Sequence, residues 1–248
     1  MRRHHLTATA CLALLAGTSH AAFLVTYEAP GVTNTTAGFS YVGVEKFDGR
    51  GTGVQTFSTD FGTAAQSTVI SGQYNHVQLN TVDVFGGASN SNYAVAFGNT
   101  PYDLTLSATS GGNPVPVTYF GYWLSALDRG NQVKFYRSGT EVFSFDPAQV
   151  LALTGNCPGG SYCGRPEAPY LGGNANEPYV FLNFYDQSGL GFDKISFFES
   201  PAVGGYESDN HTVGFYTRIT GEPVPEPSSF ALFGLALAGL AATRRRVR

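Results

Sequence analysis

The chain has 248 residues, of which 31 are glycine, 13 are proline and only 13% are charged. This composition excludes collagen, a coiled coil and a charge-driven disordered chain, and it favours short strands joined by turns over long helices. The 42% of hydrophobic residues suffice for a substantial core, because a domain of this size buries roughly 70% of the surface that its unfolded chain exposes.

Residues 1–21 have the three parts of a secretory signal peptide. The basic pair Arg2-Arg3 comes first, an apolar run from Leu6 to Gly17 follows, and the small residues Ser19 and Ala21 stand three and one positions before the expected cleavage site. We therefore expect an N-terminal signal helix that is removed after Ala21 during export. A short core helix is the alternative, but it does not explain the small residues at the end of the run.

Residues 22–222 predict one β-rich domain. Period-two or continuous apolar runs recur there between turn signals, which is typical of β-strands. The runs cover residues 23–28, 39–47, 54–59, 74–79, 93–97, 104–108, 115–124, 132–136, 142–146, 179–185, 192–198 and 211–219. About twelve strands with short turns and no repeat period predict an all-β fold, an antiparallel two-sheet β-sandwich of the jelly-roll type.

One short helix is expected within this domain. The turn at residues 137–140 joins two of the predicted strands into a hairpin, and residues 147–153 follow it. Asp146 is a suitable N-cap and Pro147 a suitable first helical residue, because proline lacks the amide that the first turn leaves unbonded.

Two of the three cysteines remain after removal of the signal peptide. Cys157 and Cys163 bracket a turn-rich segment, and an oxidising exterior favours a disulfide between them. A metal or redox pair would need further ligands or a two-residue spacing. The surrounding segment, residues 156–176, is long for a connection in a compact sandwich, so it predicts a functional or a mobile loop.

An acidic segment precedes the last predicted strand. Glu207, Asp209 and Asn210 offer three oxygen-bearing side chains within four residues, and calcium is bound by several such oxygens at about 2.3–2.6 Å. If the first and last strands paired, Glu28 would join them, and calcium would clasp the two chain ends. A solvated acidic turn, in which Asp209 or Asn210 bonds its own backbone, fits the same residues. Calcium is the one cofactor that the sequence suggests.

Two neighbouring aromatic residues are candidates for sugar binding. Tyr122 and the single tryptophan, Trp123, would form the exposed aromatic platform on which a sugar ring stacks. Because they lie on a predicted strand, packing of one or both into the core is the alternative.

The sequence carries no motif of a common enzyme class: it has no phosphate-binding glycine loop with lysine, no zinc-protease helix and no nucleophile elbow. His76 and His211 are the only histidines outside the signal peptide, and His76 reads as an ordinary strand residue. We therefore expect no enzymatic activity. A jelly-roll glycoside hydrolase or lyase stays open as an alternative, because a pair of catalytic carboxylates has no sequence signature.

The C-terminal segment, residues 223–248, also has three parts. Val224-Pro225-Glu226-Pro227 is followed by an uncharged apolar run from Phe230 to Ala242 and then by Arg244, Arg245, Arg246 and Arg248. As a helix, residues 228–243 would span about 24 Å, slightly less than the hydrocarbon layer of about 30 Å, and arginine stems can reach the interface. The positive-inside bias predicts a transmembrane helix with the arginines as a cytoplasmic stop. A plain tail anchor has the same pattern.

The order of these parts resembles the PEP-CTERM sorting signal of Gram-negative bacteria. The resemblance implies that exosortase, a membrane-embedded cysteine protease or transpeptidase, reads residues 224–227 as its recognition motif. It also implies a transient inner-membrane anchor before processing, and a host that secretes exopolysaccharide. The stretches 119–123, 131–146, 180–186, 191–193 and 206–211 are similar to the body of one subgroup of exosortase-dependent surface proteins, for which no activity can be carried over.

The charge of the body limits its partners. Six of the 14 basic residues lie in the two terminal signals, which leaves 8 basic against 18 acidic residues, a net charge of −10. Such a body repels nucleic acid. We therefore expect a structural or adhesive protein of the cell surface or extracellular matrix, in contact with exopolysaccharide or another glycan. A carbohydrate-binding module with structural calcium is the first alternative.

Overall fold

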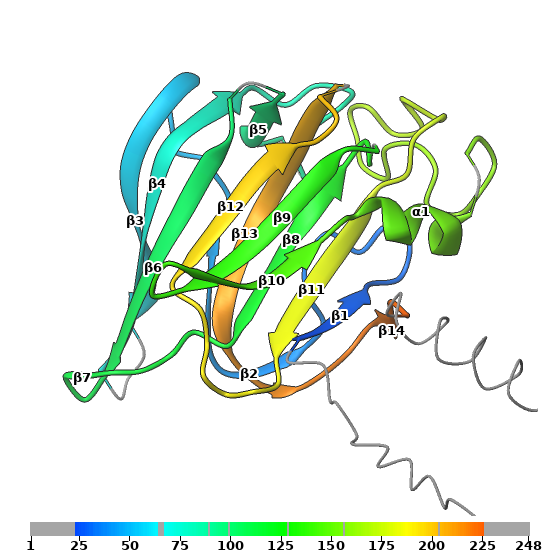
Figure 1. Cartoon of the computed structure of the whole chain (residues 1–248). Coiled ribbons are helices and arrows are strands. Elements are labelled where there is room, and N and C mark those ends of the chain that lie inside the picture. Colours follow the sequence, from blue (N-terminus) through cyan, green and yellow to red (C-terminus); the bar gives the residue numbers. More distant parts are fainter. Residues whose placement is uncertain are drawn as a thin grey trace, which may run out of the picture.

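The computed structural model describes residues 23–225 except 64–66, 89, 99, 128, 156 and 203. Antiparallel strands make up most of this region (Figure 1). The elements are β1 (Phe23–Tyr27), β2 (Gly38–Glu45), β3 (Gly53–Thr63), β4 (Thr68–Asn80), β5 (Tyr93–Phe97), β6 (Tyr102–Ser110), β7 (Asn113–Pro114), β8 (Tyr119–Ser125), β9 (Asn131–Arg137), β10 (Thr140–Phe145), α1 (Ala148–Thr154), β11 (Val180–Asp186), β12 (Lys194–Glu199), β13 (Gly205–Arg218) and β14 (Glu222–Pro223). The predicted all-β antiparallel fold is confirmed, and each of the twelve predicted runs overlaps a strand.

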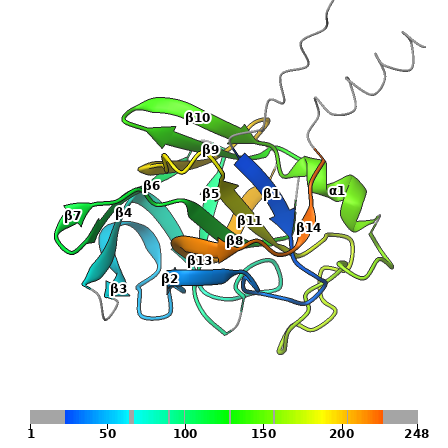
Figure 2. The same cartoon turned by 90° about the horizontal axis from the view of Figure 1, so that it is seen from below.

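The strands form two layers that are hydrogen-bonded into one curled sheet, as the view from below shows (Figure 2). The first layer contains β10, β9, β12, β6, β4 and β3 in spatial order, and the second contains β2, β13, β8, β11, β1 and β14. Strand β5 joins them, because it pairs with β4 on one side and with β13 on the other. The apolar side chains of both layers meet between them and form the main core.

Two β-bulges produce this curl. In β4 the residue pairing shifts next to His76, and in β13 it shifts between Asp209 and Thr212, beside Asn210. His76 and Asn210 have φ values of 62° and 50°. At each bulge the strand changes its neighbour: β4 passes from β6 to β5, and β13 passes from β5 to β2. Bulges that bend strands at the corners of a sandwich are an established way to join its layers.

The bulge in β13 also changes which residues point into the core. Tyr206 and Ser208 point inward before it, whereas His211 and Val213 point inward after it. A strand without the extra residue would have placed His211 on the opposite face. The bulge therefore places a histidine in the centre of the core.

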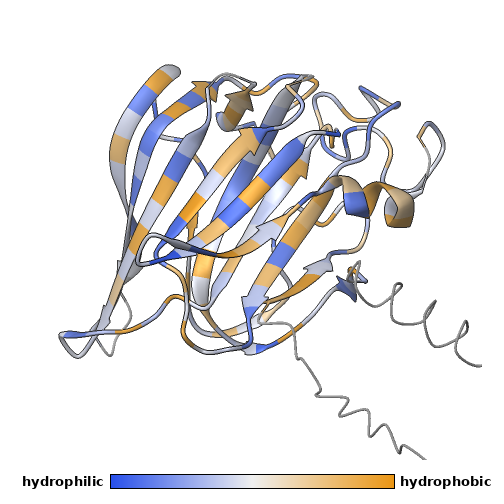
Figure 3. Cartoon of the chain, viewed as in Figure 1, coloured by the Kyte–Doolittle hydropathy of each residue, from blue (hydrophilic) through white to orange (hydrophobic). Residues whose placement is uncertain are grey.

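The outer faces of the two layers differ. The connections at residues 81–92 and 157–178 cover the outer face of the second layer. A small second core forms beneath them from Ala88, Trp123, Ala126, Tyr179 and Phe181. The outer face of the first layer carries half-buried and exposed polar side chains, and hydrophilic and hydrophobic residues alternate along its strands (Figure 3). The first layer thus offers a broad sheet face that no described connection covers.

The short helix lies where the sequence predicts it. In α1 the carboxylate of Asp146 accepts a hydrogen bond of 2.8 Å from the amide of Ala148, as an N-terminal cap would. Among the residues that the structure describes, no helix has the length and hydrophobicity needed to cross a bilayer. The expected signal helix and transmembrane helix lie outside the described residues.

Candidate functional sites

The C-terminal end of the domain is an edge strand. Val224 donates a backbone hydrogen bond of 2.9 Å to Val25, and Pro223 and Glu222 lie opposite Thr26 and Tyr27 in β1. The Val224 side chain is only 6% exposed and packs into the main core, whereas Pro225 is exposed. The predicted motif residues Glu226 and Pro227, and Arg244, Arg245, Arg246 and Arg248, lie outside the described residues.

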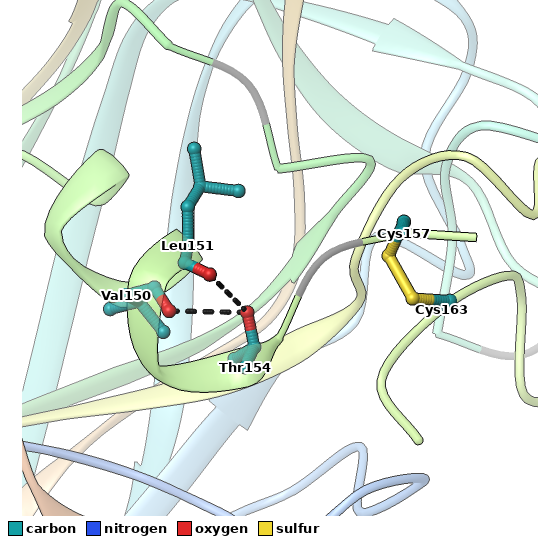
Figure 4. Close-up of a disulfide and its surroundings, with 5 residues drawn as sticks. All are labelled: Val150, Leu151, Thr154, Cys157 and Cys163. Atoms are coloured by element: carbon teal, nitrogen blue, oxygen red, sulfur yellow. Dashed lines mark hydrogen bonds between the residues drawn. A yellow bond between two sulfur atoms is a disulfide. The ribbon is translucent and has the colours of Figure 1, made fainter. Parts of the chain in front are cut away.

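The predicted disulfide is present. Cys157 and Cys163 are joined, with an S–S distance of 2.08 Å and a Cα–Cα distance of 5.5 Å (Figure 4). Just before it, α1 ends at Thr154, whose hydroxyl donates hydrogen bonds to the carbonyls of Val150, at 3.1 Å, and Leu151, at 3.4 Å. The loop that contains the disulfide is bonded to the domain: Tyr162 donates a hydrogen bond of 3.0 Å to the carbonyl of Glu28, just after β1, and accepts one of 2.9 Å from the amide of Tyr179, just before β11. The long segment is therefore part of the packing of the domain.

The predicted calcium ligands do not converge. The predicted last strand corresponds to β13, and it does not pair with β1, because β8 and β11 lie between them; β1 pairs with β14 instead. Within the described part of the chain, no three His, Cys, Asp or Glu side chains are grouped as a metal site requires. Glu207, Asp209 and Asn210 lie in β13, and Asp209 and Asn210 are buried, so the alternative of a solvated turn is wrong. The backbone bond that it expected is present, because Asp209 accepts a hydrogen bond from the amide of Asn210.

Protein donors satisfy the carboxylate of Glu28. It accepts hydrogen bonds from the amide of Thr36 (2.9 Å), the hydroxyl of Thr36 (2.8 Å) and the amide group of Asn183 (3.1 Å), with a longer contact of 3.4 Å from Thr220. Because Thr220 lies two positions before β14, Glu28 helps to hold the two ends of the domain together. Glu28 therefore links the two ends through hydrogen bonds that involve Thr220, and not together with residues 207–210 as the sequence analysis expected.

Asp209 is a fully buried carboxylate beneath the 81–92 connection. It accepts hydrogen bonds from the amides of Ala88 (2.7 Å) and Asn210 (2.6 Å) and from the hydroxyl of Ser91 (3.0 Å). Loss of hydration on burial raises the pKa of this carboxyl group to about 7, although the three donors oppose the shift. The group fastens the connection onto β13.

Neither predicted platform residue is available to a sugar. Trp123 is 1% exposed and packs in the second core, and Tyr122 is fully buried and donates or accepts a hydrogen bond with Tyr206 at 2.5 Å. Both residues pack into the interior, which was the alternative interpretation.

The two histidines of the domain have opposite environments. His76 is exposed at the β4 bulge, whereas His211 is fully buried. Six aromatic rings surround His211, with centroids 5.2–6.4 Å away: Phe47, Tyr74, Tyr102, Phe120, Tyr122 and Phe197. Burial lowers its pKa to about 3, so the imidazole is neutral at physiological pH. Without access to solvent, it cannot act on an external substrate.

Two rows of hydrogen-bonding side chains cross the outer face of the first layer. Each row follows directly opposed residues on neighbouring strands. The first row is Ser58, Gln73, Thr105, Lys194, Tyr136 and Glu141. The second row is Asn75, Asp103, Ser196, Lys134 and Ser144. We refer to these two rows as the polar face.

The charges of the polar face are paired with one another. Lys134 lies 2.9 Å from Glu141, and Lys194 lies 3.7 Å from Asp103, which also accepts a hydrogen bond from Ser196. The ammonium groups lie over aromatic rings: Lys194 is 4.3 Å from the ring centroid of Tyr136, and Lys134 is 5.5 Å from that of Phe198. The face is therefore polar and close to neutral.

A groove of about 570 Å³ opens at one end of the polar face, over β3, β4 and β6. Its lining is rich in hydroxyl groups, with one amide and one carboxylate: Ser58, Thr59, Asp60, Ser71, Gly72, Gln73, Thr105, Leu106 and Ser107. Asp60, Ser71 and Ser107 are directly opposed on their strands and form a third, shorter row. Volumes of about 300–1,000 Å³ are typical of small-ligand sites.

The sequence alternation predicts part of the polar face. It assigns Gln132, Lys134 and Tyr136 to the solvent side of one strand, and Lys194 and Ser196 to that of another. It does not show that these strands are neighbours, so the rows and the groove could not be found from the sequence.

The comparison with protein-family models decides the nature of the C-terminal segment. Residues 223–246 match the model of the PEP-CTERM protein-sorting motif. The chain carries a PEP-CTERM sorting signal. A search of curated proteins found no match.

The PEP-CTERM match supports an exported surface protein that is targeted to exosortase. It implies secretion with a transient membrane anchor that precedes processing. The match begins at Pro223, within β14, so the PEP-CTERM signal and the folded domain share residues 223–225.

Proposed function

We propose that this protein is a non-enzymatic structural or adhesive component of the cell surface or extracellular matrix, and that its polar face binds a neutral polysaccharide such as the host's exopolysaccharide. The observation that carries the proposal is the alignment of two rows of hydrogen-bonding side chains, one across six strands and one across five, on a sheet face that no described connection covers.

The composition of the polar face suits a sugar polymer. Hydroxyl, amide and carboxylate groups supply the donors and acceptors that sugar hydroxyls need. The half-buried rings of Tyr136 and Phe198 supply aromatic planes once a sugar displaces the ammonium groups of Lys194 and Lys134 that lie over them. Successive side chains within a row are about 5 Å apart, because that is the spacing of neighbouring strands. A row thus offers repeated contacts to an extended chain.

Electrostatics favour a neutral polymer. The lysines of the polar face are already paired with carboxylates, so they are not free to bind an anionic chain. The body as a whole has an excess of ten acidic groups over basic groups, which repels anionic polymers.

Substitutions on the polar face test the binding. In affinity electrophoresis of the mature protein against host exopolysaccharide and against purified neutral polysaccharides, Gln73→Ala combined with Tyr136→Ala should weaken binding by about tenfold or more. Leu171→Ala is the matched control, since Leu171 is 70% exposed on the loop that covers the other layer. Equal retention of the double variant and the unaltered protein would remove the proposed binding face.

A calcium-dependent binding module is the second candidate, and the same assay separates the two. Because the hydrogen bonds of Glu28 and Asp209 need no ion, we expect chelation to leave retention unchanged. Loss of binding in a chelator would favour the calcium candidate.

Sorting has its own test in the native host. Glu226→Ala, or deletion of residues 244–248, should leave an unprocessed form in the inner membrane. Unchanged size and location after cell fractionation would contradict the proposed processing.

A further inference from the structure

The PEP-CTERM signal begins inside the folded domain, and the contacts of β14 define how it is held. Among the described strands, β14 pairs with β1 alone, and Val224 extends this pairing by one hydrogen bond and by its buried side chain. Just before β14, the carbonyl of Thr220 accepts hydrogen bonds from the hydroxyls of Thr26 (2.6 Å) and Tyr185 (3.3 Å). We call residues 220–224, held in this way, the latch.

The latch restrains the recognition motif. Only Pro225 separates the buried Val224 from Glu226, so at most about 7 Å of extended chain connects the core to the glutamate of the motif. A protease normally binds several residues of its substrate in an extended form. Here Glu222, Pro223 and Val224, which lie just before Pro225 and the glutamate of the motif, are paired with β1. An enzyme embedded in the membrane would also have to accommodate the entire domain within this distance.

The latch lies at an edge of the sheet, where separation costs less free energy than in the centre. It has two strand residues and a partner on one side only, and it lies at the end of the strand order. Short edge segments with few contacts open at lower free energy than central strands. Its separation from β1 would free Val224 and the motif while leaving β1 paired with β11.

We propose that the latch controls exosortase processing: the folded domain withholds the sorting motif while β14 is paired with β1, and the enzyme acts on the form in which β14 has separated. This inference rests on exosortase processing and adds a conformational step before it.

A reversible cross-link tests the proposal in the full chain, expressed in the host with its exosortase. Tyr27 and Glu222 are directly opposed, and opposed residues of an antiparallel pair lie about 4.5–5.5 Å apart at Cα, within the range of a disulfide. Tyr27→Cys combined with Glu222→Cys, oxidised with diamide, should be processed at least about fivefold more slowly than after reduction with dithiothreitol. The two single cysteine variants and the unaltered protein, treated alike, control for the substitutions and for reduction of the native disulfide.

Two further variants should act in the opposite direction. Inserting Gly-Ser-Gly-Ser between Pro223 and Val224 leaves residues 224–227 intact and adds up to about 13 Å of chain beyond the cross-link, so it should restore processing while the cross-link is closed. Gly221→Ala leaves the motif unaltered but places a Cβ 2.6 Å from the hydroxyl oxygen of Thr26 and 2.8 Å from the carbonyl of Tyr27, at a φ of 83°. It should weaken the latch and accelerate processing.

The outcomes are distinguishable. Processing of the cross-linked protein at the rate of its reduced form would overturn the latch. Unchanged processing of Glu226→Ala would instead contradict the proposed exosortase processing itself, whatever the result with the cross-link. A cross-linked form that stays unprocessed even with the insertion would also overturn the proposal, because the cross-link would then act by some effect other than withholding the motif.

Discussion

The hydroxyl of Tyr74 and Nδ1 of His211 lie 2.9 Å apart in the centre of the core, although 137 positions separate the two residues in the chain. Nε2 of His211 lies 3.0 Å from the hydroxyl of Ser208, which in turn lies 2.9 Å from that of Tyr102. Tyr74 lies just before the β4 bulge and His211 just after Asn210 of the β13 bulge. A buried polar network therefore connects β4 of the first layer with β13 of the second, next to the bulge of each strand.

His211 should make stability depend on pH. Its folded pKa of about 3 lies below the ordinary value of 6.5, so only the unfolded chain binds this proton between these values. The contribution is fully present above pH 6.5 and is lost as the pH falls, by about 1.4 kcal/mol per pH unit. We expect His211→Phe to remove this acid-side loss in urea unfolding curves measured from pH 4 to 6.5. It should also lower stability near pH 7 by about 1–3 kcal/mol, because Tyr74 loses its buried partner.

Asp209 should have the opposite dependence. Burial raises its folded pKa from 3.8 to about 7, so the folded state binds the proton more tightly than the unfolded chain does. The resulting contribution to the free energy of unfolding is fully present below pH 3.8 and is lost as the pH rises toward 7. In Asp209→Asn this loss disappears, and unfolding free energies should then rise from pH 4 to 6.5 through His211 alone. In His211→Phe they should fall over the same range. Slopes of equal sign in the two variants would contradict one of the two pKa directions.

The crossing of β2 and β3 depends on Gly43. A Cβ at this position would overlap the carbonyl oxygen of Phe61 and lie 2.6 Å from its Cβ, and no rotamer change can relieve a clash with backbone. Gly43→Ala should therefore destabilise the domain by about 3 kcal/mol. Gly49→Ala is the matched control, because nothing lies within 4 Å of its Cβ position. Equal melting temperatures for the two variants would show that β2 and β3 are not in close contact.

The disulfide should contribute modestly to stability. Cys157 and Cys163 are six positions apart, and closing so short a loop in the unfolded chain contributes about 2 kcal/mol by chain entropy. Replacing both cysteines by serine should lower the unfolding free energy by about that amount and make it insensitive to reductant. Retained sensitivity of the double variant to dithiothreitol would point to another reducible group.

The local signals of the chain were sufficient for much of the fold. Alternation located the strands, proline and aspartate located α1, and the spacing of two cysteines in a turn-rich segment located the disulfide. The acidic segment at residues 207–210 misled the sequence analysis, because aspartate and asparagine are typical of turns. In the structure the same residues form the bulged half of β13, where the 81–92 connection supplies donors to Asp209.

The features that could not be predicted from the sequence depend on contacts between distant segments. Period-two patterning shows that a strand has two different faces, but the order of strands, and whether a second connection covers the outer face, follow from non-local pairing. That pairing aligns Gln73 with Thr105 and Lys194 on the polar face, buries Trp123 beneath a loop and places β14 on β1. The C-terminal signal could be read from its residues because an enzyme recognises it as a linear segment, whereas the latch that restrains it exists only once the two ends of the domain have met.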